Sequence, residues 1–151
     1  MKTNKNKISV LGGGSWGTVL AYLASANGNS VNLWMRNRES ANEINTKNIN
    51  SKYLPNLNLS KDIFATNDLS DISDSELIIF CVPSDSFREV AEAAVKVIRK
   101  DIGLVTATKG VEKGGFKLMS NVLREHFPDN PIGIISGPNL AEEIANHNLS
   151  G

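Results

Sequence analysis

The sequence has few of the residues that several functional classes require. It contains one cysteine, Cys81, so it cannot form an internal disulfide, and this fits a reducing cytoplasm. Its only histidines, His126 and His147, leave little material for a zinc site, and we expect no bound metal. The 16 basic and 16 acidic residues cancel, which removes the electrostatic case for binding nucleic acid or an anionic membrane.

Long hydrophobic runs are also missing. The longest, such as residues 77–82, have the length of a strand and are far too short to cross a bilayer. The basic residues 1–7 lead into a glycine-rich turn rather than an apolar segment, so we expect neither a signal peptide nor an integral membrane contact. An apolar content of 40% and a charged content of 21% favour a globular domain over disorder, and we assign residues 1–151 to one domain.

Short apolar runs alternate with amphipathic segments along the chain. The apolar runs predict strands over residues 7–11, 30–35, 63–66, 77–82, 103–107 and 132–136. Helical spacing and end signals predict helices over residues 15–27, 40–46, 86–100 and 116–127. Runs that are continuously apolar are typical of parallel strands covered on both faces. We therefore predict an α/β fold: a doubly wound, mostly parallel sheet with helices on both faces.

The most informative segment is Gly12-x-Gly14-x-x-Gly17, between the first expected strand and the first expected helix. Gly12 permits a tight turn, Gly14 lets the backbone approach a pyrophosphate, and Gly17 lets the helix pack close to the strand. The helix that begins near Ser15 directs free N–H groups and its positive dipole end at the phosphates. This context predicts a Rossmann-type dinucleotide site, and the alternative is a glycine-rich turn without a ligand.

The residues after the second expected strand bear on the cofactor. An NAD site usually places Asp or Glu here, about 20 residues past the first glycines, whereas this chain has Arg36-Asn37-Arg38. Arginine can bind a 2′-phosphate through charge-assisted hydrogen bonds and can stack on adenine. We therefore predict NADP as the preferred cofactor, with NAD as a second one. The alternative is that these arginines are solvated surface residues.

Other strand ends should reach the same cleft, because ligands lie outside the carboxyl ends of the strands. Pro83 should lie near the nicotinamide ribose, while Lys109 either contacts a phosphate or substrate oxygen or is solvated at the surface. The segment with Gly137 and Asn139 either contacts a ligand or only begins a helix. We expect Phe87 in the core and Cys81 as a small buried residue rather than a nucleophile.

Several motifs then occur in order: Gly-Gly-Gly-Ser-Trp-Gly-Thr at 12–18, Leu-Trp-Met-Arg at 33–36, Tyr-Leu-Pro-Asn at 53–56, Val-Pro-Ser at 82–84, Thr-Lys-Gly-Val-Glu at 108–112 and Ser-Gly-Pro-Asn at 136–139. With them the chain resembles the amino-terminal domain of soluble, bacterial-type NAD(P)-dependent glycerol-3-phosphate dehydrogenases. The resemblance implies interconversion of sn-glycerol 3-phosphate and dihydroxyacetone phosphate, in the cytoplasm, for phospholipid synthesis.

The resemblance also assigns residues. It implies cofactor contacts at Ser15, Trp16, Arg36, Tyr53, Lys109 and Ala141, which join Gly12, Gly14, Gly17 and Pro83 from the motifs above. It implies substrate contacts at Lys109, Gly137 and Asn139. The positive charge of Lys109 would stabilise negative charge on the carbonyl oxygen during reduction.

The chain departs from the family in its last part. The family usually has Ser or Thr in place of Asn139 and an aromatic residue in place of Leu140. It also has a carboxy-terminal helical domain with a second lysine, the proton donor or acceptor, which we expect this chain to lack. We therefore assign no catalytic residue, including His126 and His147, and expect cofactor binding with little turnover; a homo-oligomer is one expected state. The alternatives are another two-domain Rossmann dehydrogenase, for a hydroxy acid or sugar acid, and a non-catalytic nucleotide-binding remnant.

Overall fold

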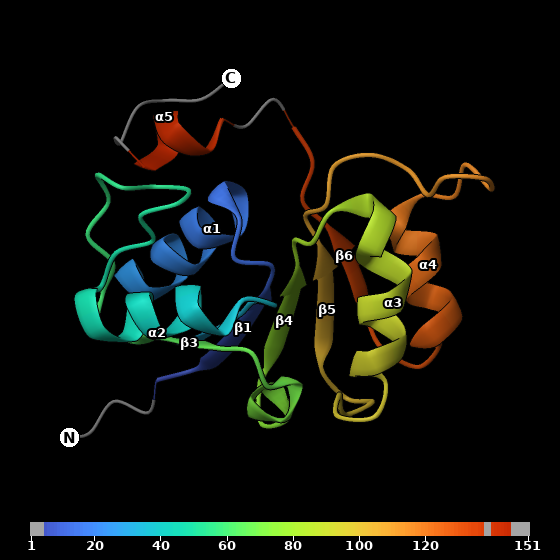
Figure 1. Cartoon of the computed structure of the whole chain (residues 1–151). Helices are drawn as coiled ribbons and strands as arrows, with labels where there is room; N and C mark the ends of the chain where they lie inside the picture. Colours follow the sequence, from blue (N-terminus) through green and yellow to red (C-terminus); the bar gives the residue numbers. More distant parts are fainter. Residues whose placement is uncertain (1–4, 138–139, 146–151) are drawn as a thin grey trace.

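A single parallel sheet organises the molecule. The computed structural model describes residues 5–137 and 140–145. Its six strands are ordered β3-β2-β1-β4-β5-β6 (Figure 1), and each neighbouring pair is parallel. They are β1 (Lys7–Leu11), β2 (Ser30–Trp34), β3 (Ile63–Thr66), β4 (Leu77–Phe80), β5 (Gly103–Thr106) and β6 (Ile132–Ile134). The strand order reverses between β1 and β4, which confirms the predicted doubly wound sheet.

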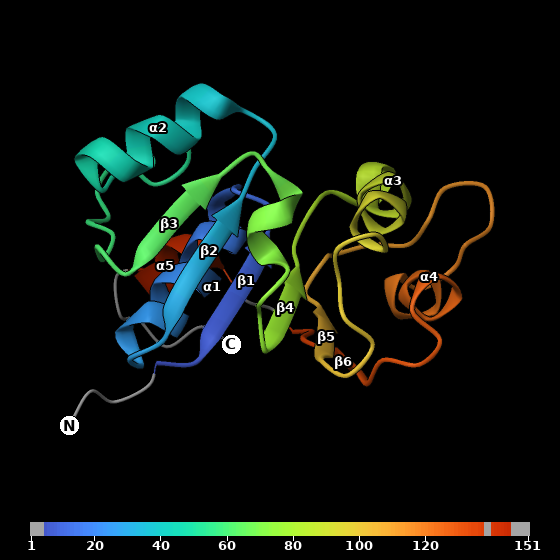
Figure 2. The same cartoon turned by 90° about the horizontal axis from the view of Figure 1, so that it is seen from below.

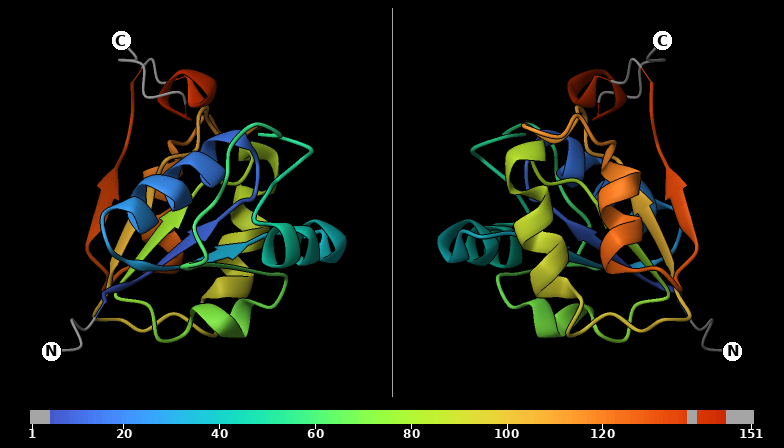
Figure 3. Two further views of the ribbon diagram at one scale, coloured as in Figure 1. Left: turned by 90° about the vertical axis from the view of Figure 1, so that its left-hand side faces the viewer. Right: turned by 90° about the vertical axis from the view of Figure 1, so that its right-hand side faces the viewer.

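Helices cover both faces of the sheet. They are α1 (Ser15–Ala26), α2 (Arg38–Lys47), α3 (Ser84–Ala94), α4 (Met119–His126) and the short α5 (Ala141–Ala145), with a 3₁₀ turn η1 at Leu69–Ile72. Buried apolar residues of α1 and α2 belong to one core cluster, and those of α3 and α4 to another. In Figure 2, α1 and α2 lie toward β1, β2 and β3, and α3 and α4 lie toward the other end of the sheet; Figure 3 gives two side views. No helix in the described part of the chain is long and apolar enough to cross a membrane.

The core is divided by the sheet because successive strand residues point to opposite faces. In β1, Val10 packs with the apolar residues of α1 and α2, whereas Leu11 packs with those of α3 and α4. Phe87 of α3 is fully buried against Phe80 of β4, with ring centroids 5.6 Å apart. Phe87 is therefore a core residue, as its helical spacing predicts.

The asparagine-rich segment around α2 is shaped by side-chain amides. Asn37 caps the helix by accepting from the Ser40 N–H at 2.7 Å, and Asn48 ends it in a left-handed conformation with φ +55°. Asn45 then bonds both backbone groups of Ala65 in β3, each at 2.8 Å. With Asn37 and Asn48 at its ends, the helix extends beyond the predicted 40–46 in both directions, and Asn45 joins it to β3.

The predicted limits of α3 and α4 are also wrong. α4 begins at Met119 rather than at Phe116, which is 84% exposed and has φ +50°. The turn before it contains Gly114, whose φ of +85° is incompatible with a right-handed helix. Val111 and Leu118 form an isolated antiparallel β-bridge across this turn. α3 begins at Ser84, directly after Pro83, and ends at Ala94, although Ile98 beyond it remains buried. Apolar spacing marked the buried face and not the helix ends.

Candidate dinucleotide site

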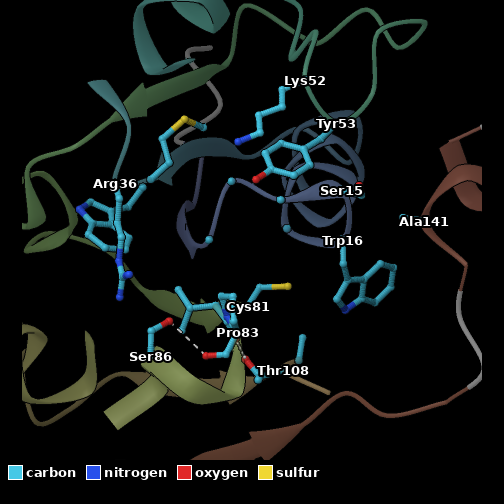
Figure 4. A pocket seen from close by; sticks show the side chains of 18 of the residues that line it. Ser15, Trp16, Arg36, Lys52, Tyr53, Cys81, Pro83, Ser86, Thr108 and Ala141 are labelled. Carbon is cyan, nitrogen blue, oxygen red and sulfur yellow. Dashed lines mark hydrogen bonds between the residues drawn. The ribbon is translucent and has the colours of Figure 1, made fainter. Parts of the chain in front are cut away.

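A cavity of about 700 Å³ opens where the chain leaves the carboxyl ends of β1, β2, β4 and β5. This is the point of strand reversal, where doubly wound sheets bind ligands, and the volume is that of a small-molecule site. Figure 4 shows the cavity between the start of α1 and the strand ends. Every residue that the sequence predicts for the cofactor lines it: Gly12, Gly14, Ser15, Trp16, Gly17, Arg36, Tyr53, Pro83, Lys109 and Ala141.

The motif glycines have different structural roles. Gly12 has φ +125°, and an added Cβ would lie 2.5 Å from the carbonyl oxygen of Cys81. A Cβ on Gly17 would lie 1.8 Å from the carbonyl oxygen of Gly12. Both positions must therefore be glycine for the strand and helix to pack. Gly14 has an ordinary φ of −74°, and a Cβ there would meet nothing within 4 Å.

The start of α1 is open to an anion. Gly14 is its N-cap, no side chain caps the helix, and the first turn has no acidic residue. The Thr18 N–H donates to the Gly14 carbonyl at 2.9 Å, so the helical ladder begins at this residue. The N–H groups of the first turn and the positive end of the helix dipole are thus directed at the cavity.

A loop after α2 is fixed over the glycine turn. The buried Asn50 amide donates to the Gly13 carbonyl at 3.0 Å and to the Thr18 hydroxyl at 2.9 Å. The same loop brings Lys52 and Tyr53 to the cavity, with the Lys52 Nζ 5.2 Å from the Tyr53 ring centroid (Figure 4). The family motif predicted Tyr53 as a site residue, but nothing in the sequence predicted Lys52 or Asn50. Their positions depend on how the loop packs over the glycine turn.

The charges at the cavity have one sign. Its described lining includes the basic residues Arg36, Lys52 and Lys109 and contains no Asp or Glu. Arg36 follows β2, and its Nη2 lies 3.2 Å from the Glu89 Oε2 of α3, with both side chains more than half exposed. The arrangement favours an anionic ligand.

Lys109 lies between two cavities. A second cavity of about 240 Å³ shares Trp16 and Lys109 with the first and also includes Gly137. The residue before Lys109 is held in place because the Thr108 hydroxyl donates to the Val82 carbonyl at 2.8 Å. Gly137, for which a substrate contact is predicted, lines this second cavity, whereas Asn139 and His147 lie outside the described residues.

An ionic network fixes the loop that follows Lys109. The Arg88 Nε donates to the Glu112 Oε1 at 2.6 Å, and the Arg88 Nη2 pairs with the Glu125 Oε2 at 2.8 Å. The Arg88 hydrogen bond lowers the pKa of Glu112 below its ordinary value of 4.5. His126 contacts Arg88 at 3.2 Å and does not line either cavity.

Cys81 is not an activated thiol. Burial raises its pKa to about 12, an effect that the charge of Lys109 only partly offsets. A thiol of this kind is neutral near neutral pH and behaves as a small hydrophobic residue, as predicted. Among the described residues, no group of His, Cys, Asp and Glu could hold a metal ion.

The residues present fit a nicotinamide dinucleotide. An open helix start faces the cavity, Gly14 leaves space that a Cβ would fill, and the cations suit phosphate groups. The lining is otherwise mostly apolar and includes Trp16 and Tyr53, as is typical of sites for flat rings.

Known proteins are similar to this chain in sequence and in fold. A glycerol-3-phosphate dehydrogenase [NAD(P)+] from Alcanivorax borkumensis is 38% identical over 152 residues, covering 100% of this chain and 44% of its own length. One from Acinetobacter baumannii is 44% identical over 91% of this chain and 39% of its own length. The crystal structure of the Coxiella burnetii glycerol-3-phosphate dehydrogenase is 34% identical, with a TM-score of 0.88 over 94% of this chain and 44% of that one.

The chain thus spans less than half the length of these relatives. The sequence model of one family, "NAD-dependent glycerol-3-phosphate dehydrogenase N-terminus", matches residues 7–151, which include all of the sheet and the cavity. The chain therefore belongs to the NAD-dependent glycerol-3-phosphate dehydrogenase family and corresponds to its N-terminal part.

Proposed function

We propose that this chain binds the cofactor of a glycerol-3-phosphate dehydrogenase, with NADP preferred and NAD as the second cofactor. The observation that carries the proposal is Gly14. It lines the cavity, its backbone conformation suits any residue, and a side chain there would meet no neighbour. Packing does not require glycine at this position, whereas a diphosphate against the start of α1 does.

The rest of the lining can hold the other parts of the dinucleotide. The first-turn N–H groups of α1 would bind the diphosphate, and Arg36 would bind the 2′-phosphate by charge-assisted hydrogen bonds. Tyr53 and Trp16 offer aromatic surface, and Pro83 after β4 would lie against the nicotinamide ribose. Residues from three strand ends and from the loop after α2 would thus hold one extended ligand.

The chemistry of the reaction fits the position of Lys109. When bound, the cofactor supplies or accepts a hydride. Lys109 would hold the substrate oxygen and stabilise its negative charge as dihydroxyacetone phosphate is reduced. Gly137, in the second cavity, and Asn139 would bind the remainder of the substrate. We assign the proton transfer to a lysine outside this chain, as in the family, so the 151-residue chain should show little turnover.

The setting of this reaction is also proposed. Glycerol 3-phosphate is a precursor of glycerophospholipids, and the free thiol of Cys81 fits a reducing compartment. We place the protein in the cytoplasm, in phospholipid synthesis. An enzyme for an unphosphorylated hydroxy acid or sugar acid would not retain glycerol 3-phosphate, so saturable binding of this ester beside the cofactor discriminates between the two reactions.

Titration with reduced cofactors, followed by the fluorescence of Trp16 and Trp34, tests the proposal. We expect a saturable change with NADPH and a weaker complex with NADH. In an Arg36→Ala variant, the ratio of the NADPH to the NADH dissociation constant should rise about tenfold, because only NADPH carries the phosphate that Arg36 would bind. No saturable change with either cofactor would contradict the proposal, and an unchanged ratio would remove Arg36 from this role.

A further inference from the structure

The ion pair between Arg36 and Glu89 joins a residue that lines the cavity to an acid just outside its lining. Arg36 follows β2, and Glu89 lies in the middle of α3. The contact is a single one, from the Arg36 Nη2 to the Glu89 Oε2 at 3.2 Å. The Arg36 side chain is 57% exposed and the Glu89 side chain 79% exposed. An exposed ion pair of this kind contributes little to the stability of the fold, so a role in stability does not explain why the two charges are paired.

The pair matters more for the ligand than for the fold. A 2′-phosphate on Arg36 either displaces the Glu89 carboxylate or binds beside it. In both cases the Glu89 carboxylate competes for the guanidinium that the 2′-phosphate, an anion with nearly two charges, would bind. The 2′-hydroxyl of NAD carries no charge and depends far less on that guanidinium. Glu89 therefore acts against one cofactor and leaves the other unaffected.

Resting on the proposed cofactor role of the cavity, we propose that Glu89 is a specificity-determining residue that competes with the 2′-phosphate for Arg36. It narrows the difference between NADP and NAD, so that the site accepts both. The sequence between Gly12 and Arg38 has no acid that could serve this purpose from β2. The charge comes instead from α3, which is distant in sequence and adjacent only in the fold.

A Glu89→Gln variant tests this proposal because it removes the charge and keeps the size and helix propensity of the side chain. We expect the NADPH dissociation constant to fall about three- to tenfold and that of NADH to stay within about twofold. Glu92→Gln is the matched control, because Glu92 is an exposed acid one turn further along α3 and Arg36 pairs with Glu89 instead, and it should change neither value. The gain for NADPH should shrink at high salt.

Repeating the Glu89→Gln substitution in the Arg36→Ala variant separates competition for Arg36 from a structural effect of Glu89. In the Arg36→Ala variant, Glu89→Gln should give no further gain in NADPH affinity, because the competition requires Arg36. Equal changes for NADPH and NADH would indicate a merely structural role, and an unchanged NADPH affinity or a gain that persists without Arg36 would overturn the proposal. Failure of the wild-type chain to bind either cofactor would instead contradict the proposed function itself.

Discussion

At the scale of single residues, burial decides the chemistry of Cys81. Its side chain lies beside the glycine turn, where a Cβ added to Gly17 would lie 3.5 Å from the Cys81 Cβ. The desolvated thiol has its pKa raised to about 12. A position next to a proposed cofactor site thus gives no nucleophile, because nothing there stabilises the thiolate enough to offset burial.

Alkylation of the single cysteine measures this directly. At about pH 8, roughly 10⁻⁴ of the Cys81 thiol is ionised, against roughly a quarter of an unperturbed thiol. We expect iodoacetamide to modify the folded chain at least about 100-fold more slowly than the urea-unfolded chain. The unfolded chain is its own control because it carries the same thiol. Similar rates in the two states would show that Cys81 is accessible and ionised.

Which residues the sequence could predict depends on how their roles arise. Gly12, Gly14 and Gly17 act through local backbone geometry, and a strand–turn–helix pattern is enough to find them. Lys52 lines the cavity because Asn50 holds its loop over the glycine turn. Glu89 of α3 contacts Arg36 only because the fold brings the two together. No spacing in the sequence marks such residues.

At the scale of elements, Arg88 joins α3, α4 and the loop after Lys109. It forms ion pairs with Glu112 in the loop and with Glu125 in α4. The pKa values of both carboxyl groups are lowered. Arg88 is the main cause for Glu112, whereas Lys117 is the main cause for Glu125 and Arg88 the second. The folded state therefore holds protons on these groups less readily than the unfolded state. Their stabilisation is present above their ordinary pKa of 4.5 and is lost as pH falls through the lower folded values.

An Arg88→Met variant tests the sign of this effect. We expect the free energy of unfolding, measured in urea, to fall less steeply for the variant than for the wild type between about pH 6 and pH 3. Arg124→Met is the control, since Arg124 is exposed on α4 and is not among the groups that lower these pKa values. Parallel pH profiles for Arg88→Met and the wild type would contradict the account of the network.

The limits of helices and strands were predicted well where the hydrophobic periodicity matches the packing. They were predicted poorly where turn or capping geometry sets the end of the element. The strands β1 and β3 have the predicted limits. The start of α4 depends on the turn around Gly114 and the bridge from Val111 to Leu118, which apolar spacing does not encode. Asn37 and Asn48 lengthen α2 through capping geometry that only the fold reveals.

At the scale of the whole molecule, the strand order places the site. With β1 and β4 adjacent, the chain leaves them toward opposite faces, and the cavity lies at the point of divergence. The alternation of strands and helices predicted this arrangement. Any one contact at the cavity is modest, so the proposed affinity for a dinucleotide depends on bringing the glycine turn, Arg36 and Lys109 to one edge of the sheet.

The central claim is that the glycine turn holds a diphosphate, and comparing Gly14→Ala with Gly17→Ala by calorimetric titration with NADPH and urea unfolding tests it most directly. Gly14→Ala should lose less than about 1 kcal/mol of stability but bind NADPH at least about tenfold more weakly. Gly17→Ala should lose about 1–3 kcal/mol or more, because its Cβ overlaps the Gly12 carbonyl. A folded Gly14→Ala chain that binds NADPH as tightly as the wild type would contradict the account.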